Sequence, residues 1–293
     1  MQAIKTIGFI GVGVMGEPMC RHLAQKSGAT VLACDRDAAP LARLAACGVR
    51  AATMAEVSAQ ADIVFLSLPS GEVVESVVLG ENGLLAGGRA GQIIVDLSTS
   101  TMNTARKAAE AMAARGMKFA DAPVMRTRAA AEAGTLAVPV GADDALFALV
   151  APFIRMFASD VVHAGGVGAG QVVKILNNMV LYETVLALSE ARAIGVRAGL
   201  SPQGLFEALS IGSADSFALR NHGMKAIAPQ VFPERAFPVT YARKDISYAV
   251  ALADQLGVEA TGAKNLMNCL DQAIEAGHGD KYAPAISLVF EGK

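Results

Sequence analysis

The chain has 293 residues, a length that predicts two domains. Hydrophobic residues make up 53% of it and charged residues 18%, which excludes a largely disordered protein and predicts extensive burial. The net charge of −2, a pI near 6.1 and the lack of a Lys/Arg cluster argue against general nucleic-acid binding, so small molecules are the expected partners.

Short apolar segments alternate with alanine-rich helical stretches through about residue 160. Six segments are predicted to be strands: residues 4–10, 30–35, 62–69, 92–98, 117–123 and 160–165. Alternation of strands and helices is typical of a parallel, doubly wound sheet with helices on both faces. Residues 1–164 are therefore predicted to form one α/β domain.

The first predicted strand runs into the pattern G-x-G-x-x-G, formed by Gly11, Gly13 and Gly16, and a helical stretch follows at once. In this context glycines let the backbone approach a pyrophosphate at a helix N-terminus, which indicates a Rossmann-type dinucleotide-binding domain. Asp35 ends the second strand, 19 residues after Gly16, where a carboxylate binds ribose hydroxyls. Asp35 favours NAD, but Arg36 could attract the 2′-phosphate of NADP. The alternative is a structural glycine turn beside a surface aspartate.

The pattern changes after residue 165. One long helix without proline is predicted from Gln171 to about Ala198, and the later segments are helices separated by Gly and Pro. Residues 165–293 are therefore predicted to form an all-α domain, joined to the first by this interdomain helix. The helix is apolar around nearly its whole circumference, which predicts burial against a second subunit in a homodimer or homotetramer.

Lys174 and Asn178 are spaced i, i+4 on this helix and Asn177 lies one step aside, so the three form a narrow polar stripe. Burial without a partner lowers the pKa of a lysine and makes it a candidate general acid/base near neutral pH. The alternative is a lysine whose side chain reaches the surface. Its place just after the domain switch, where a cleft is expected, favours catalysis.

Cysteines and histidines are scattered along the chain. The four cysteines lie far apart without a C-x-x-C pair, which predicts neither a disulfide framework nor a metal site and is typical of a cytoplasmic protein. The apolar stretch at residues 1–16 is too short and too rich in glycine to span a membrane, so no membrane partner is expected.

Four ordered motifs, GFIGVGVMGEPM, DAPV…AGTL, GVGAGQVVKILNN and KDI, resemble those of the β-hydroxyacid dehydrogenase family over essentially the whole chain. The resemblance implies reversible hydride transfer between NAD(P) and a small β-hydroxy acid or semialdehyde acid, without a metal. It implies Lys174 as the catalytic acid/base and Asn178 as the residue that orients the substrate. Lys244 would close over the cofactor, although its segment alone reads as a surface helix. The glycine pattern and the resemblance together predict these cofactor-binding residues: Gly11, Val12, Gly13, Val14, Met15, Gly16, Asp35, Arg36, Leu68, Pro69, Thr99 and Lys244.

The chain departs from the family after DAPV. Where many members have Ser-Gly-Gly to hold the substrate carboxylate, it has Met125, Arg126 and Thr127. Loss of both glycines removes the close backbone approach, so Arg126 is expected to bind the anion through its guanidinium and Thr127 through its hydroxyl. Together with Asn177, these are the predicted substrate-binding residues. Arg128 lies two positions further along what is predicted to be an extended loop, and it is predicted to face solvent.

An Arg-Thr pair at this place resembles the branch that contains sulfolactaldehyde reductase, which indicates a sulfonate or a longer carboxylate as substrate. Leu181 stands where sulfonate-binding members have a serine, which argues against a sulfonate. Tyr282 replaces an aspartate common in the family, without a reason visible in the sequence. The alternative function is a nicotinamide-binding scaffold without activity, and Lys174 argues against it.

Overall fold

The computed structural model of the chain describes residues 4–233 and 236–291. The chain forms two compact units that divide between Lys174 and Ile175. The elements of the first unit are β1 (Thr6–Ile10), α1 (Gly16–Lys26), β2 (Thr30–Cys34), α2 (Ala38–Ala45), β3 (Arg50–Ala51), α3 (Met54–Gln60), β4 (Ile63–Leu66), α4 (Gly71–Leu79), α5 (Leu84–Gly87), β5 (Ile93–Asp96), α6 (Met102–Ala113), β6 (Lys118–Asp121), α7 (Arg128–Ala133), β7 (Leu136–Gly141), α8 (Asp144–Ile154) and β8 (Ala158–Gly165). Helix α9 (Ala169–Arg197) begins in the first unit and continues into the second.

The strands form one eight-stranded sheet in the order β3-β2-β1-β4-β5-β6-β7-β8. All neighbours pair in parallel except β6 and β7, which meet in antiparallel orientation at Asp121 and Gly141. The order reverses between β1 and β4, and ligands of such sheets bind outside the carboxyl ends of the strands at that point. The predicted doubly wound α/β fold is confirmed, with one antiparallel pair in an otherwise parallel sheet.

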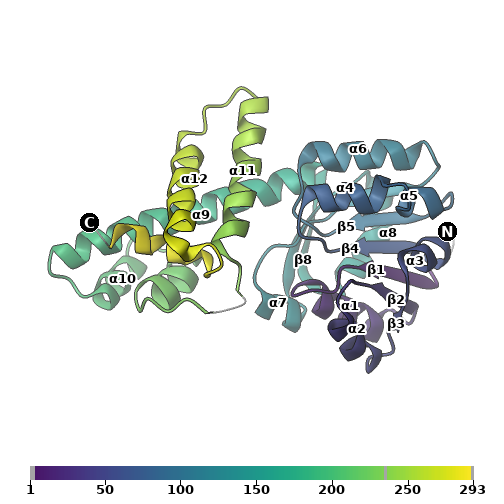
Figure 1. The fold of residues 1–293 in the computed structure, drawn as a ribbon, viewed down its shortest axis with the longest axis horizontal. Helices are drawn as coiled ribbons and strands as arrows, with labels where there is room; N and C mark the ends of the chain where they lie inside the picture. Colours follow the sequence, from purple (N-terminus) through teal and green to yellow (C-terminus); the bar gives the residue numbers. More distant parts are fainter. Residues whose placement is uncertain (1–3, 234–235, 292–293) are drawn as a thin grey trace. The chain divides into compact units, whose positions relative to one another are not determined.

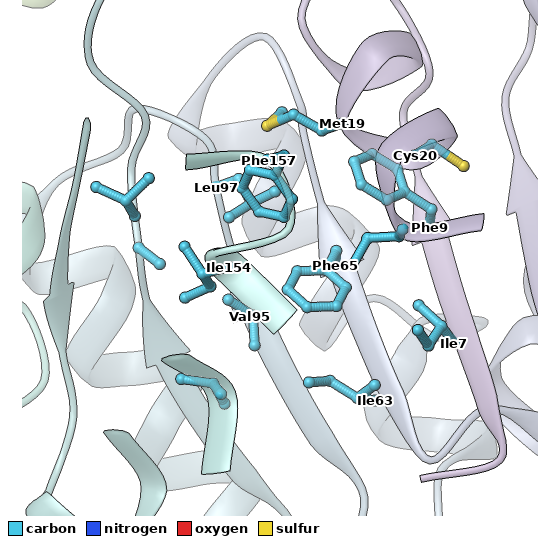
Figure 2. Close-up of a cluster of buried hydrophobic side chains, with 14 of the residues drawn as sticks. Ile7, Phe9, Met19, Cys20, Ile63, Phe65, Val95, Leu97, Ile154 and Phe157 are labelled. Carbon is cyan, nitrogen blue, oxygen red and sulfur yellow. The ribbon is translucent and has the colours of Figure 1, made fainter. Parts of the chain in front are cut away.

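Helices cover both faces of the sheet (Figure 1). On one face Phe65 stacks on Phe9 and meets Phe157 edge-on, with ring centroids 6.2 Å apart in both pairs, and helices α1 and α8 close this core (Figure 2). Helices α3 to α6 pack against the other face. Successive strand residues point to opposite faces of the sheet. On β1 and β4 the side chains on both faces are buried in these two cores. Each fully buried large side chain stabilises the fold by about 1.5–3 kcal/mol.

Six of the eight strands were predicted from their apolar segments. The strand β7 was missed because Pro139 lies within it and a proline lacks the N–H of a ladder hydrogen bond. The structure tolerates Pro139 because β7 pairs along its length only with β8 and meets β6 at a single residue pair. The two-residue strand β3 is too short to give a signal.

The second unit is helical over the residues that the structure describes there. After α9 it contains α10 (Pro202–Ser210), a π-helix η1 (Leu219–Ile227), α11 (Val239–Gln255), α12 (Thr261–Ala273), a second π-helix η2 (Ile274–His278) and a 3-10 helix η3 (Ala283–Phe290). Helices α11 and α12 lie side by side and share a core with α9 (Figure 1). The predicted all-helical C-terminal region is confirmed, and the domain boundary between residues 164 and 165 stays a prediction.

Helix α9 is long and apolar enough to cross a membrane by length and composition alone. Four of its apolar side chains instead belong to the core of the second unit: Tyr182, Val185, Leu186 and Leu188. A central helix of a globular protein has the same composition, because it is buried on more than one side.

Candidate active site

Three glycines shape the loop between β1 and α1. Gly11 has φ +89°, and a Cβ on it would overlap the carbonyl oxygen of Ser67. A Cβ on Gly16 would overlap the carbonyl oxygen of Gly11. By contrast, the Cβ position of Gly13 faces open space, with nothing within 4 Å. Gly11 and Gly16 therefore close the turn, and Gly13 leaves room for a pyrophosphate.

The start of α1 is suited to an anion. Short polar side chains cap many of the other helices: Asp37, Thr53, Ser70, Thr101, Asp143 and Ser201 each accept a hydrogen bond from a backbone N–H of the first turn. The residue before α1 is Met15, whose side chain makes no such bond. Within the first turn the Glu17 N–H donates to the Gly13 carbonyl at 3.0 Å, and Pro18 has no N–H. The positive end of the helix dipole, without a capping side chain, is what suits an anion such as a phosphate. Within the loop Val12 is buried and Val14 is half exposed.

Asp35 holds the glycine loop. Its Oδ2 accepts a hydrogen bond from the Val12 N–H at 2.6 Å, and its Oδ1 accepts one from the Asp37 N–H at 2.8 Å. Each carboxylate oxygen can accept a further bond, so the same side chain has capacity for ribose hydroxyls. Arg36 is exposed beside it. The arrangement fits a dinucleotide. The preference for NAD or NADP then depends on the Asp35 carboxylate, which disfavours a 2′-phosphate, and on the Arg36 guanidinium, which could attract one.

The loops after β4 and β5 are linked by hydrogen bonds. The Leu68 N–H donates to Ser98 Oγ at 2.9 Å, and the Ser98 N–H donates to Asp96 Oδ1 at 2.9 Å. Ser100 Oγ donates to Asp96 Oδ2 at 3.3 Å. Pro69 is exposed beside Leu68, and Thr99 lies half-buried between the two serines. The structure therefore brings the predicted cofactor-lining segments together at the carboxyl edge of the sheet.

Two aspartates are fully buried beneath these loops. Burial raises the pKa of Asp96 to about 7, although hydrogen bonds from Ser98 oppose the shift. Burial also raises the pKa of Asp121 to about 6, opposed by backbone N–H groups of Gly168 and Gln171. Buried carboxylates that hold backbone donors fix the loops around them, because an unpaired backbone group would be costly.

Arg126 keeps the backbone conformation of a glycine. Its φ is +81°, a left-handed value that costs about 1–2 kcal/mol for a residue with a side chain. Its guanidinium contacts two residues of β8 and the residue before β7. Nη1 donates to the Thr135 carbonyl at 2.6 Å and to Ser159 Oγ at 2.9 Å, and Nη2 pairs with Asp160 Oδ2 at 2.8 Å. Glycine adopts this backbone conformation without strain, and the expected loss of the close backbone approach, which depends on the side chain, stays a prediction. In the predicted contact, the guanidinium of Arg126 would bind the substrate anion and Asp160 at the same time.

The segment after Arg126 is a short helix, where an extended loop was expected. Its sequence RAAAEA favours helix because alanine has the highest helix propensity. Thr127 precedes the helix, and Met125 bridges to Ala137 in β7. Arg128, with its side chain 54% exposed, lies 3.6 Å from Glu132, one turn along the helix.

Helix α9 carries the predicted catalytic residues. Lys174 is half-buried, and Asn178 is buried one turn later. Asn177 Nδ2 donates to Asn178 Oδ1 at 3.0 Å, and Asn178 Nδ2 donates to Asp245 Oδ2 at 2.6 Å. The Asn178 amide is therefore held in one orientation, as expected of a residue that orients a ligand.

Lys244 lies in α11, beside Asp245. Its Nζ is 3.1 Å from Asp245 Oδ1, and it lies 5.8 Å and 5.4 Å from the ring centroids of Tyr241 and Tyr248. An ammonium near two aromatic rings is favoured by their negative faces. These contacts describe the second unit alone, and the role of Lys244 toward the cofactor stays a prediction.

Tyr282, which replaces an aspartate common in the family, contacts a buried histidine. Its hydroxyl lies 2.6 Å from Nδ1 of His222, which is 5% exposed. Burial lowers the pKa of His222 to about 4 and raises that of Tyr282 to about 12, so the tyrosine donates to a neutral imidazole at neutral pH. The tyrosine thus satisfies a buried histidine. Leu181, at the other departure from the family, packs against the core of the second unit.

Sequence reasoning missed three polar residues of the site. Asp245 lies within the KDI motif and was visible as an acid on the apolar face of an amphipathic helix, next to Ala242 and Ile246. Gln171, in the first turn of α9, and Asp121, at the end of β6, are both fully buried. Their partners are distant in the chain, so no local pattern indicated them. Among residues 4–233 and 236–291, no group of three His, Cys, Asp or Glu side chains is placed to hold a metal ion.

Two family models match the chain. One, described as the NAD binding domain of 6-phosphogluconate dehydrogenase, matches residues 6–166. The other, described as the NAD-binding of NADP-dependent 3-hydroxyisobutyrate dehydrogenase, matches residues 168–288. The two matches cover nearly the whole chain in the order that the four motifs predicted.

Individual relatives agree. The chain is 38% identical to 2-(hydroxymethyl)glutarate dehydrogenase of Eubacterium barkeri, over 85% of this chain and 83% of the relative. It is 36% identical to 3-hydroxyisobutyrate dehydrogenase of Pseudomonas aeruginosa, over 98% and 99% of the two chains. The solved structure of the Mycobacterium tuberculosis 3-hydroxyisobutyrate dehydrogenase with L-serine has a TM-score of 0.89 and 29% identity, over 99% of this chain and 100% of that one.

The glycine loop is suited to a dinucleotide, and the names of the relatives indicate the chemistry that this architecture serves. The relatives are named as dehydrogenases of small hydroxy acids, and both family models are described as NAD-binding. The resemblance seen in the four motifs is confirmed: the chain belongs to the β-hydroxyacid dehydrogenase family and is an NAD(P)-dependent oxidoreductase that acts on the CH–OH group of small hydroxy acids.

Proposed function

We propose that the protein interconverts a small β-hydroxy acid and its semialdehyde acid, with Lys174 as the general acid/base and Asn178 as the residue that orients the substrate. The observation that carries the proposal is the placement of this i, i+4 pair on α9, whose first turn is hydrogen-bonded to the loop that carries Thr99. That loop is the predicted neighbour of the nicotinamide, so an amine one turn further on is suited to a proton transfer beside the hydride transfer.

The bound cofactor supplies or accepts the hydride at the carbon of the alcohol or carbonyl group. In the reducing direction Lys174 donates a proton to the carbonyl oxygen, and in the oxidising direction it takes the hydroxyl proton. Asn178, fixed by Asp245, offers its carboxamide to the same substrate. Asn177, hydrogen-bonded to Asn178, is the further substrate-binding residue of this helix.

We propose that the substrate is a carboxylic acid with a carbon chain longer than three carbons, and not a sulfonate. Arg126 and Thr127 stand where a compact Ser-Gly-Gly would serve a short acid, and Leu181 offers no hydroxyl to a sulfonate. The Eubacterium barkeri relative is named for a β-hydroxy acid with two carboxylates, which supports a longer acid. NAD is the proposed cofactor, since the Asp35 carboxylate disfavours a 2′-phosphate.

A substrate screen tests the function. Semialdehydes of two to five carbons with carboxylate, phosphonate and sulfonate ends are offered with NADH and NADPH in parallel, and cofactor oxidation is followed at 340 nm. The proposal expects the highest kcat/KM for a four- or five-carbon carboxylate with NADH. A higher kcat/KM for a sulfonate would contradict the proposed substrate class. No turnover of any of these semialdehydes would contradict the proposed interconversion.

Arg126→Ala is expected to raise KM for the preferred acid at least about tenfold, because a charge-assisted hydrogen bond contributes on the order of 1.5–3 kcal/mol. Initial rates over a range of substrate concentrations measure it. Asp160→Asn is the matched control: it breaks the same Arg126–Asp160 ion pair but leaves the guanidinium in place. An unchanged KM in the alanine variant would exclude the contact, and an equal rise in Asp160→Asn would mean that Arg126 acts by holding the loop.

We further propose a cytoplasmic homodimer or homotetramer. Leu176, Val180, Ala187 and Ile194 are exposed on α9 and recur at spacings of four and seven residues, so they form one apolar stripe. A second copy of the chain is the proposed partner for this stripe. Light scattering after gel filtration should give at least twice the mass of 30.1 kDa, and a monomer at micromolar concentration would contradict the proposal.

A further inference from the structure

Gln171 is a fully buried polar side chain in the first turn of α9, and no predicted role includes it. Its carboxamide makes two hydrogen bonds to the loop after β5: Oε1 accepts from the Ser100 N–H at 2.9 Å, and Nε2 donates to the Ser98 carbonyl at 2.8 Å. These two backbone groups flank Thr99. A single side chain from α9 therefore holds the loop on both sides of the residue predicted to lie beside the nicotinamide.

The backbone of Gln171 is fixed in turn. Its N–H donates to Asp121 Oδ2 at 2.8 Å, and the Gly168 N–H donates to Asp121 Oδ1 at 2.6 Å. A carboxylate that accepts from the first N–H groups of a helix stabilises the helix start. Asp121 is itself the last residue of β6. The start of α9 is thus fixed against the sheet, and the Gln171 side chain extends that fixed point to the loop.

The loop is held from the other side by Asp96, which accepts from the Ser98 N–H and from Ser100 Oγ. Asp96 at the end of β5 and Gln171 on α9 therefore both bind Ser98 and Ser100. Lys174 lies three residues after Gln171 on the same side of the helix, about 4.5 Å along its axis at a rise of about 1.5 Å per residue. The Gln171 carboxamide thus links this loop directly to the helix that carries the lysine.

We propose that Gln171 is a positioning residue that sets the register between the loop of Thr99 and the helix of Lys174. The inference rests on the proposed function for the roles of those two residues. Both halves of the carboxamide are needed, because the loop presents one donor and one acceptor. Leucine at this position offers neither partner, and glutamate keeps the acceptor for Ser100 but sets an oxygen against the Ser98 carbonyl.

The test compares Gln171→Leu and Gln171→Glu with a matched control, Gln92→Leu. Gln92 is also buried, 1% exposed, and its Nε2 donates to the carbonyls of Ser58 and Ala61 at 2.9 and 2.8 Å. It directly precedes β5, at the opposite end of the strand from the Thr99 loop. The control therefore loses a buried carboxamide with two backbone partners in the same unit, away from the reacting groups.

Gln171→Leu is expected to lower kcat by about 10- to 100-fold, since a small misplacement of reacting groups has that effect. The dissociation constant of NADH should change less than about threefold, because the glycine loop and Asp35 are untouched. The isotope effect on kcat with NADH deuterated at the transferred hydrogen should rise, because hydride transfer becomes the slow step. Gln171→Glu should lower kcat as well, and Gln92→Leu should leave kcat, the isotope effect and NADH binding unchanged.

Hydrogen exchange of the Ser100 amide gives a readout without substrate or cofactor. Its exchange should quicken about tenfold in Gln171→Leu, which removes its acceptor, and stay slow in Gln171→Glu and Gln92→Leu. Unchanged kcat and unchanged Ser100 exchange in Gln171→Leu would overturn the proposal, as would an equal loss of kcat in Gln92→Leu. If Gln171→Leu does not fold, Gln171→Glu decides, with wild-type kcat as the overturning result. If the wild-type protein turns over no hydroxy acid, the proposed function fails, while the exchange data still decide whether Gln171 holds the loop.

Discussion

Lys174→Ala is expected to lower kcat by about 100- to 10,000-fold, the range that a positioned general acid/base contributes. The dissociation constant of NADH should stay within about threefold of the wild-type value, because the pyrophosphate and ribose contacts predicted for the glycine loop and Asp35 do not involve α9. Single-turnover oxidation of bound NADH measures the chemical step, and quenching of cofactor fluorescence measures binding.

Lys174→Arg separates proton transfer from charge. Arginine keeps a positive charge at the same place, but it cannot be deprotonated in a protein and so cannot serve as the acid/base at neutral pH. Loss of turnover in both variants supports proton transfer by Lys174. Substantial residual turnover in the alanine variant would exclude the catalytic assignment, and activity in the arginine variant alone would reduce it to electrostatic stabilisation.

Gly16→Ala is expected to lower the free energy of unfolding by more than about 3 kcal/mol, at the upper end of what overpacking costs, because its Cβ would overlap the backbone carbonyl of Gly11. A backbone oxygen cannot rotate away as a side chain can. Chemical denaturation followed by circular dichroism measures the change.

Gly13→Ala is the matched control from the same loop. Nothing lies within 4 Å of its Cβ position, so the unfolding free energy should change by less than about 1 kcal/mol. The added methyl group would occupy the space left for the pyrophosphate, so the dissociation constant of NADH should rise at least about tenfold. Equal stability of the two variants, or wild-type NADH affinity in Gly13→Ala, would contradict these roles of the glycines.

The sequence was sufficient for most of the fold because the sheet is buried on both faces. Strands such as β4 and β5 are then continuous apolar segments, and glycine or charged residues mark their ends. The strand β7 escaped because Pro139 breaks that pattern, and its tolerance depends on pairing with β8 that no local signal shows. Antiparallel pairing of β6 and β7 is likewise a property of the folded chain.

The candidate site could be proposed from the sequence where its residues are close together in the chain. The glycine loop and the pair Lys174 and Asn178 are local patterns, read at fixed spacings. Gln171 and Asp245 were missed because what defines them is a partner about 70 residues away: Ser98 for Gln171 and Asn178 for Asp245. A buried glutamine beside a lysine carries no periodic signal, and its importance follows only from what its two amide atoms contact.

The backbone at Arg126 has a consequence for substitutions at this position. Because Arg126 adopts φ +81°, a conformation that glycine adopts without strain, a glycine at this position would relieve backbone strain, although it would lose the bonds of the guanidinium. The backbone conformation at this position therefore suits either residue, while the side chain alone decides whether a guanidinium is available for the substrate contact proposed for Arg126. For that proposed contact, a change of side chain at residue 126 would change the charge offered to the anion without requiring a new backbone conformation.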